Sequence, residues 1–122
     1  MSNLAPLAGL TSLTSLDLSG TKVSDVSALT ALKNFNRLYL SRTPVSDVSG
    51  MSGLKRLLHL VLNKTQVSDL SAIAGLTNLT HLNLSGTKIT DVSAIKGLSK
   101  LNELDLSGTK VSHVILKRGH KN

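Results

Sequence analysis

Apolar residues recur along this 122-residue chain at intervals of 22 residues, in six columns that stay in phase through five rows. No row carries an insertion between these columns. The columns are Leu10, Leu32, Leu54, Leu76 and Leu98; Leu13, Phe35, Leu57, Leu79 and Leu101; Leu16, Leu38, Leu60, Leu82 and Leu104; Leu18, Leu40, Leu62, Leu84 and Leu106; Val23, Val45, Val67, Ile89 and Val111; and Val26, Val48, Leu70, Val92 and Val114. Such a period predicts a solenoid, in which stacked rows bury a continuous core.

The repeats run from about residue 4 to residue 114, and we expect residues 1–122 to form a single domain. Residues 115–122 leave the pattern as a basic C-terminal tail. Aromatic residues make up only 2% of the chain, so the predicted core consists of Leu, Ile, Val and Ala. The chain contains no Cys, which excludes disulfides, thiolate metal sites and Cys nucleophiles.

Each row carries a short segment in which apolar residues alternate with polar ones, as in Leu16-Asp17-Leu18. A period of two is typical of a strand with one buried face, so we expect a strand near residues 15–19 and its counterparts 22 residues apart. Stacking would place these strands side by side in a parallel sheet, about 4.8 Å apart. Leu13, Leu16 and Leu18 would then point inward.

A threonine follows every strand, and an aspartate precedes Ser in most of the return segments. The two columns are Thr21, Thr43, Thr65, Thr87 and Thr109, and Asp25, Asp47, Asp69 and Asp91. A buried Thr hydroxyl can satisfy backbone groups where the chain turns beneath the sheet. The Asp column favours a capped turn or a short 3₁₀ piece, in which Asp accepts backbone N–H groups. Calcium binding by the Asp column and ice binding by the Thr column are the alternatives.

The row from Leu76 to Ile95, LTNLTHLNLSGTKITDVSAI, resembles the 22-residue, internalin-like class of bacterial leucine-rich repeats. The resemblance covers about nine-tenths of the chain, although Thr stands where this class usually has the ladder Asn. It implies an α/β leucine-rich-repeat solenoid with five short parallel strands on the concave face. Tight turns or short 3₁₀ pieces, with little true helix, would form the convex face. Neither end of the sequence shows a recognisable capping module.

Function is expected in the outward-facing columns, because the inward ones are occupied by the core. Rows two and three depart from the Leu-Ser-Gly-Thr-Lys sequence that rows one, four and five share after the strand. If the chain has a specific contact surface, its predicted centre comprises Arg37, Tyr39, Arg42, His59, Val61, Lys64 and His81. Tyr and Arg are common anchors of protein interfaces. The alternative is that these rows have drifted without selection for a partner.

His59, His81 and Glu103 share one column, and such side chains can bind zinc. A flat, solvated row rarely converges to a tetrahedral site, so we predict no metal site and no cofactor. No Ser-His-acid order, glycine-rich phosphate loop or zincin spacing is present. We therefore predict no catalytic residues and no enzymatic activity.

The pattern favours a protein–protein interaction module that binds a protein partner through the exposed concave face. The second hypothesis is a scaffold, an engineered repeat protein or a fragment without its own partner. In that case uncapped ends would cause self-association as a homo-oligomer, since Leu4, Leu7 and Leu10 cover little at one end. Ile115 and Leu116 would form only a partial lid at the other end.

The net charge of +7 raises the question of nucleic acid, but the basic residues are scattered or lie in the tail. Only Phe35 and Tyr39 are aromatic, so the stacking platforms of nucleic-acid grooves are lacking and this partner is not favoured. The sequence has no run of 18 apolar residues and no apolar leader. We therefore expect no membrane span and a cytoplasmic location.

Overall fold

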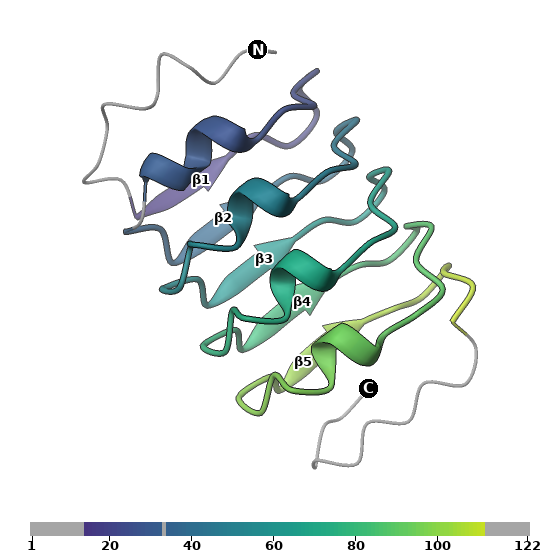
Figure 1. Cartoon of the computed structure of the whole chain (residues 1–122). Coiled ribbons are helices and arrows are strands. Elements are labelled where there is room, and N and C mark those ends of the chain that lie inside the picture. The colour runs from purple at the N-terminus through teal and green to yellow at the C-terminus, as the bar shows by residue number, and fades with distance from the viewer. Residues whose placement is uncertain (1–13, 33, 112–122) are drawn as a thin grey trace.

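Five short strands form one parallel sheet in a computed structural model that describes residues 14–32 and 34–111 (Figure 1). The sheet order follows the chain: β1 (Ser15–Asp17), β2 (Arg37–Tyr39), β3 (His59–Val61), β4 (His81–Asn83) and β5 (Glu103–Asp105). Each residue pairs with the one 22 positions later, as Leu38 does with Leu60. The predicted repeat register is therefore confirmed.

The return segments carry only short 3₁₀ turns: η2 (Ser27–Ala31), η3 (Ser49–Met51), η4 (Ser71–Ile73) and η5 (Ser93–Ile95). Figure 1 shows these turns stacked in a second layer beside the sheet. The structure contains no α-helix within the two described ranges, as predicted for a solenoid with little true helix. Accordingly, none of its described helices has the length and apolar character needed to cross a membrane.

The core lies between the sheet and the 3₁₀ layer and is filled by the apolar columns. Leu38 and Leu60 are fully buried at the centres of their strands, and Val45 and Val67 are fully buried on the return segments. Phe35 stands in a leucine column and is also fully buried. Neighbouring rows therefore bury each other's side chains, and the stack excludes water without a second sheet.

Buried threonines hold the turn that follows each strand. Thr43, Thr65 and Thr87 are 2–4% exposed, and each hydroxyl donates to the leucine carbonyl three residues earlier at 2.7–2.8 Å. The Thr65 hydroxyl also accepts the N–H of Val67 at 3.5 Å. All buried polar side-chain atoms in the described part have such partners. The predicted backbone role of the Thr column is confirmed, and a buried hydroxyl already bonded to the backbone does not suit ice binding.

The aspartates organise the entry to each 3₁₀ turn. A carboxylate oxygen of Asp47 accepts the N–H of Ser49 at 2.9 Å, and Asp25, Asp69 and Asp91 make the same contact. This hydrogen bond lowers the pKa of each of the four carboxyls below its ordinary value. The predicted capped turn is confirmed as an Asx turn, since Asp lies one residue before the 3₁₀ cap.

The predictions about the ends of the solenoid concern Leu4, Leu7, Leu10, Ile115 and Leu116, which lie outside the described residues. The expected end-to-end association therefore stays a prediction.

Replacing Thr65 with Val should destabilise the solenoid by about 1–2 kcal/mol, because the Leu62 carbonyl loses its hydroxyl donor in a buried site. Urea denaturation followed by circular dichroism measures the change. The matched control is Thr90→Val at an exposed position of the fourth row, which should stay within about 0.5 kcal/mol of the parent. Equal effects of the two substitutions would contradict the role assigned to the buried hydroxyl.

Candidate functional site

Five of the seven predicted contact residues lie together on the outward face of three adjacent strands. The ladder pairs Arg37 with His59 and His59 with His81, so these residues form one column across β2, β3 and β4. Tyr39 and Val61 are paired in the next column. Arg37 is exposed and the other four are half-buried. The alternation within each strand places them outward because the leucine between them enters the core.

The remaining two predicted residues, Arg42 and Lys64, lie in the turns that follow β2 and β3, where the other rows have Gly. Both have a left-handed backbone, with φ of 59° and 58°. The glycines at the same position, Gly20, Gly86 and Gly108, have φ of 75°, 70° and 73°. A side chain in this region costs about 1 kcal/mol relative to Gly, because its Cβ crowds the backbone.

The turn geometry explains this conformation in rows one, four and five, where a backbone hydrogen bond closes the turn. In the first row the N–H of Thr21 bonds to the Leu18 carbonyl at 3.2 Å, which closes a four-residue turn with Gly20 at its third position. Only the third residue has positive φ, as in a type II turn, where Gly is the preferred residue. Rows two and three keep the same positive φ, but a cation stands there in place of Gly.

We define the central face as the outward side chains of residues 37–42, 59–64 and 81–86. Its fixed cations are Arg37, Arg42 and Lys64, and these segments contain no carboxylate. The one ion pair among the described residues joins His81 to Glu103, so none of the three cations has a carboxylate partner there. Fixed positive charge therefore stays exposed in rows two and three.

The rings of His59 and His81 are stacked face to face, with centroids 4.1 Å apart and planes within 6°. The Nδ1 atom of His81 lies 2.8 Å from the Thr80 hydroxyl, and its Nε2 atom lies 3.4 Å from a Glu103 oxygen. The pKa of His59 is lowered from its ordinary value, chiefly by burial and then by the charges of His81 and Arg37, while Glu103 acts in the opposite direction.

The stacking also determines what the two imidazoles can coordinate. Ring nitrogens bind metals through lone pairs in the ring plane, and two nearly parallel planes do not converge on a shared ion. Within residues 14–32 and 34–111, no group of three or more His, Asp or Glu side chains is arranged to hold a metal ion. The geometry thus suits a contact surface better than a metal centre.

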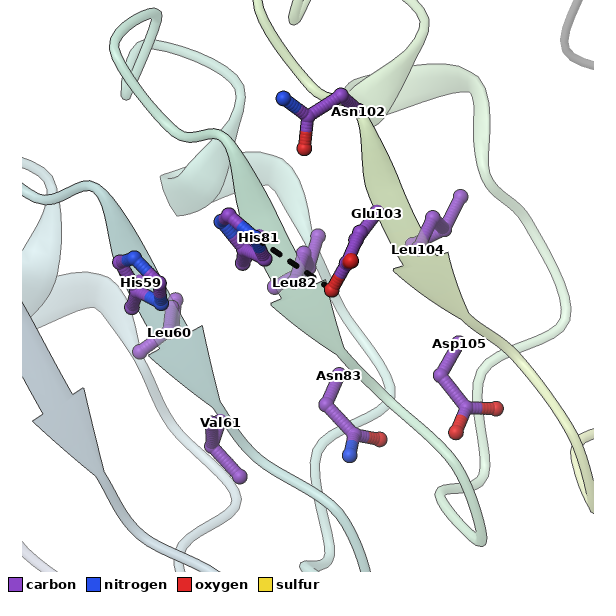
Figure 2. A pocket seen from close by; sticks show the side chains of 10 residues that line it. All are labelled: His59, Leu60, Val61, His81, Leu82, Asn83, Asn102, Glu103, Leu104 and Asp105. Carbon is purple, nitrogen blue, oxygen red and sulfur yellow. Dashed lines mark ion pairs between the residues drawn. The ribbon is translucent and has the colours of Figure 1, made fainter. Parts of the chain in front are cut away.

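An open groove of ≈ 750 Å³ runs over β3, β4 and β5. Figure 2 shows His59, His81 and Glu103 following one another across the three strands, with Val61, Asn83 and Asp105 in the adjoining column. The lining residues are His59, Leu60, Val61, His81, Leu82, Asn83, Asn102, Glu103, Leu104 and Asp105. Because the groove is open rather than enclosed, its shape suits a segment of a macromolecule better than a small substrate.

Leu58 is a surface residue that the sequence prediction missed. Its side chain is 38% exposed, and it is the only large hydrophobic residue with that much exposure in the described part of the chain. It directly precedes β3, in a column whose other members are Thr14, Asn36, Thr80 and Asn102. Comparing the five rows at this column would have identified it, since every other row has a polar residue there.

Comparison with protein families matches two segments of the chain. Residues 77–114 match the family of leucine-rich repeats in two copies, and residues 9–30 match the family of the single leucine-rich repeat. Comparison with curated protein sequences gives no match.

Solved structures of similar shape include two internalins of Listeria monocytogenes. The chain is 29% identical to one internalin with a TM-score of 0.89, covering 93% of this chain and 34% of that one. It is 34% identical to internalin C2 with a TM-score of 0.89, covering 97% and 54%. A leucine-rich-repeat protein of Leptospira interrogans has 25% identity and a TM-score of 0.78, covering 84% and 27%. The chain spans about half or less of the length of these proteins.

Replacing Arg42 or Lys64 with Gly should stabilise the chain by roughly 0.5–1 kcal/mol each, because the left-handed backbone no longer carries a Cβ. Urea denaturation measures the free energy of unfolding. The reverse control is Gly20→Ala, which introduces a Cβ with open space around it and should destabilise by a similar amount. If both Gly variants were less stable than the parent, the Arg42 and Lys64 side chains would stabilise the folded chain by more than the left-handed backbone destabilises it.

The free energy of unfolding should fall as the pH is lowered from about 7 to about 5. The folded pKa of His59 is depressed, so its stabilising contribution is complete above the ordinary value of 6.5 and is lost as the pH falls through the folded value. Urea denaturation at a series of pH values tests this, with His59→Gln as the comparison. The fall should be smaller in the variant, and an unchanged pH profile would contradict the assignment to His59.

Proposed function

The chain is a leucine-rich-repeat protein of the internalin-like class, and we propose on this basis that it binds a protein partner through the exposed face of its sheet. Leucine-rich-repeat domains generally serve as protein-interaction modules. The proposal for this chain is that its central face forms the contact surface. That the partner is a protein, and that any longer protein containing these repeats acts through such binding, is also part of this proposal.

The main support for this face as the contact surface is that it brings together side chains of different chemistry, although the repeats beneath it are regular. Arg37, Tyr39, His59, Val61 and His81 occupy two adjoining columns of three strands. Interfaces favour aromatic and Arg side chains near their centre, surrounded by polar groups. Here Tyr39 and Val61 lie side by side, with Arg37 and the imidazoles in the next column.

The backbone beneath these residues makes the surface rigid. The N–H of Leu40 bonds to the Val61 carbonyl at 2.8 Å, and the N–H of Arg42 continues the same ladder to Asn63 at 3.0 Å. A contact surface that is ordered before binding loses less conformational entropy when the partner docks. The sheet therefore supports a preorganised surface in place of a flexible loop.

Arg37→Glu and Tyr39→Ala should each weaken partner binding by at least about tenfold, because they remove candidate anchors at the centre of the face. The chain would be immobilised to identify partners by mass spectrometry, and each would then be titrated against purified variants. Circular dichroism verifies that each variant keeps the fold.

The matched control is Lys96→Glu, which makes the same charge change as Arg37→Glu but lies beside η5, away from the sheet face. It should leave affinity within about twofold of the parent. If Lys96→Glu weakened binding as much as Arg37→Glu, the contact would depend on net charge and the assignment to the face would be wrong. Binding unaffected by both Arg37→Glu and Tyr39→Ala would also refute it, and a failure to find any partner would favour the scaffold hypothesis.

A further inference from the structure

The fixed charges of the sheet face are segregated by row. Rows two and three carry Arg37, Arg42 and Lys64, whereas the carboxylates of this face lie in the flanking rows, at Asp17, Glu103 and Asp105. The Asp residues that precede the 3₁₀ turns lie on the return segments, outside the strands of the sheet. The positive charge in the middle of the face is therefore not neutralised by its own surface.

We infer that the partner contributes an acidic polypeptide segment that lies along the face over β2 and β3. Its carboxylates would contact Arg37 at the start of β2, and Arg42 and Lys64 in the turns that follow the two strands. This inference rests on the proposed function and names the chemistry of its partner. Arg can bind a carboxylate through two parallel hydrogen bonds, and Lys adds a compact charge. Three cations on two adjacent rows suit a segment with several acidic residues better than one with a single acidic residue.

The backbone strain supports a role for the two turn cations. Arg42 and Lys64 adopt the left-handed conformation that Gly adopts in the three other rows. Backbone strain of this kind persists where the surrounding structure imposes it and is concentrated at functional positions. The two side chains make no hydrogen bond or ion pair with the described residues that would offset the strain. A bound carboxylate would supply the missing partner.

The neighbouring row leaves room for the Lys64 side chain. A Cβ atom built on Gly86 would lie only 3.1 Å from Lys64 Cγ, so the lysine stem lies over the glycine. Next to it, Asn63 accepts the Ser41 hydroxyl through its carbonyl oxygen, which leaves the amide nitrogen as a further donor for a ligand. Consecutive residues after β3 thus carry an ammonium group and an amide donor.

The adjoining apolar side chains favour a polypeptide over a nucleic acid. Tyr39 and Val61 are half-buried on the face, and Leu58 is exposed at the start of β3. These side chains can contact apolar residues of an acidic segment. A single-stranded nucleic acid instead needs successive aromatic platforms, and Phe35, the only other Phe, Tyr or Trp of the chain, is buried.

The test titrates the full chain into a fluorescent synthetic peptide of alternating Glu and Tyr residues, with affinity measured by fluorescence anisotropy. The matched probes are a peptide with Lys in place of Glu and a single-stranded oligonucleotide of equal charge. The double variant Arg42→Gly with Lys64→Gly removes both turn cations and is expected to stabilise the chain, and circular dichroism verifies that it keeps the fold. The control double variant, Lys55→Gln with Lys96→Gln, removes the same charge away from the face.

The parent chain should bind the Glu peptide in preference to the other two probes, and added salt should weaken this binding. The double Gly variant should bind it about tenfold more weakly, and the control variant within about twofold of the parent. No binding of the Glu peptide, or equal loss in the two double variants, would overturn the inference. A second outcome is that the Lys peptide binds more strongly than the Glu peptide and that Tyr39→Ala abolishes this binding. It would overturn the inference that the partner segment is acidic, but the proposed function of the face would still hold. Stronger binding of the oligonucleotide would overturn both.

Discussion

The bond between a buried threonine hydroxyl and a leucine carbonyl is the interaction on which each turn of this solenoid depends. The chain must reverse beneath the sheet in every row, and a buried carbonyl there requires a donor. Thr43, Thr65 and Thr87 supply that donor at 2.7–2.8 Å. Because the reversal occurs at the same place in each row, the 22-residue register is maintained from β1 to β5. The side chains of the candidate face line up in columns because every strand pairs with its neighbour in this same register.

Inside and outside of the sheet obey different constraints. Leu38, Leu60 and Leu82 are almost completely buried, and a change in any of them would alter the spacing of neighbouring rows. The outward positions lie outside the core, so Arg37, His59 and their counterparts can differ without changing the packing of the leucines. The exposed columns are therefore the positions at which the side chains can differ from row to row.

The sequence was sufficient to predict the sheet order, the register and the roles of Thr and Asp, because each follows from the spacing of residue types. It also identified the position of Arg42 and Lys64 as unusual, since Gly occupies it in three rows. The positive φ of these residues, the face-to-face stacking of His59 and His81 and the groove over β3 to β5 required coordinates. Those features depend on backbone angles and side-chain rotamers, which a period of 22 residues does not determine. The exposed Leu58 was missed for a different reason, because a lone leucine in a leucine-rich sequence resembles one more core residue.

The left-handed turn at Arg42 and Lys64 has a consequence for attempts to idealise this protein. A designer who averaged the five rows into one consensus unit would place Gly at the third turn position and a polar residue at the position of Leu58. The resulting solenoid would be more regular and less strained, yet it would lack the features that distinguish its middle rows. In a repeat protein of this kind, the difference between a row and the average of its neighbours identifies positions where the chain keeps a side chain that its backbone conformation disfavours.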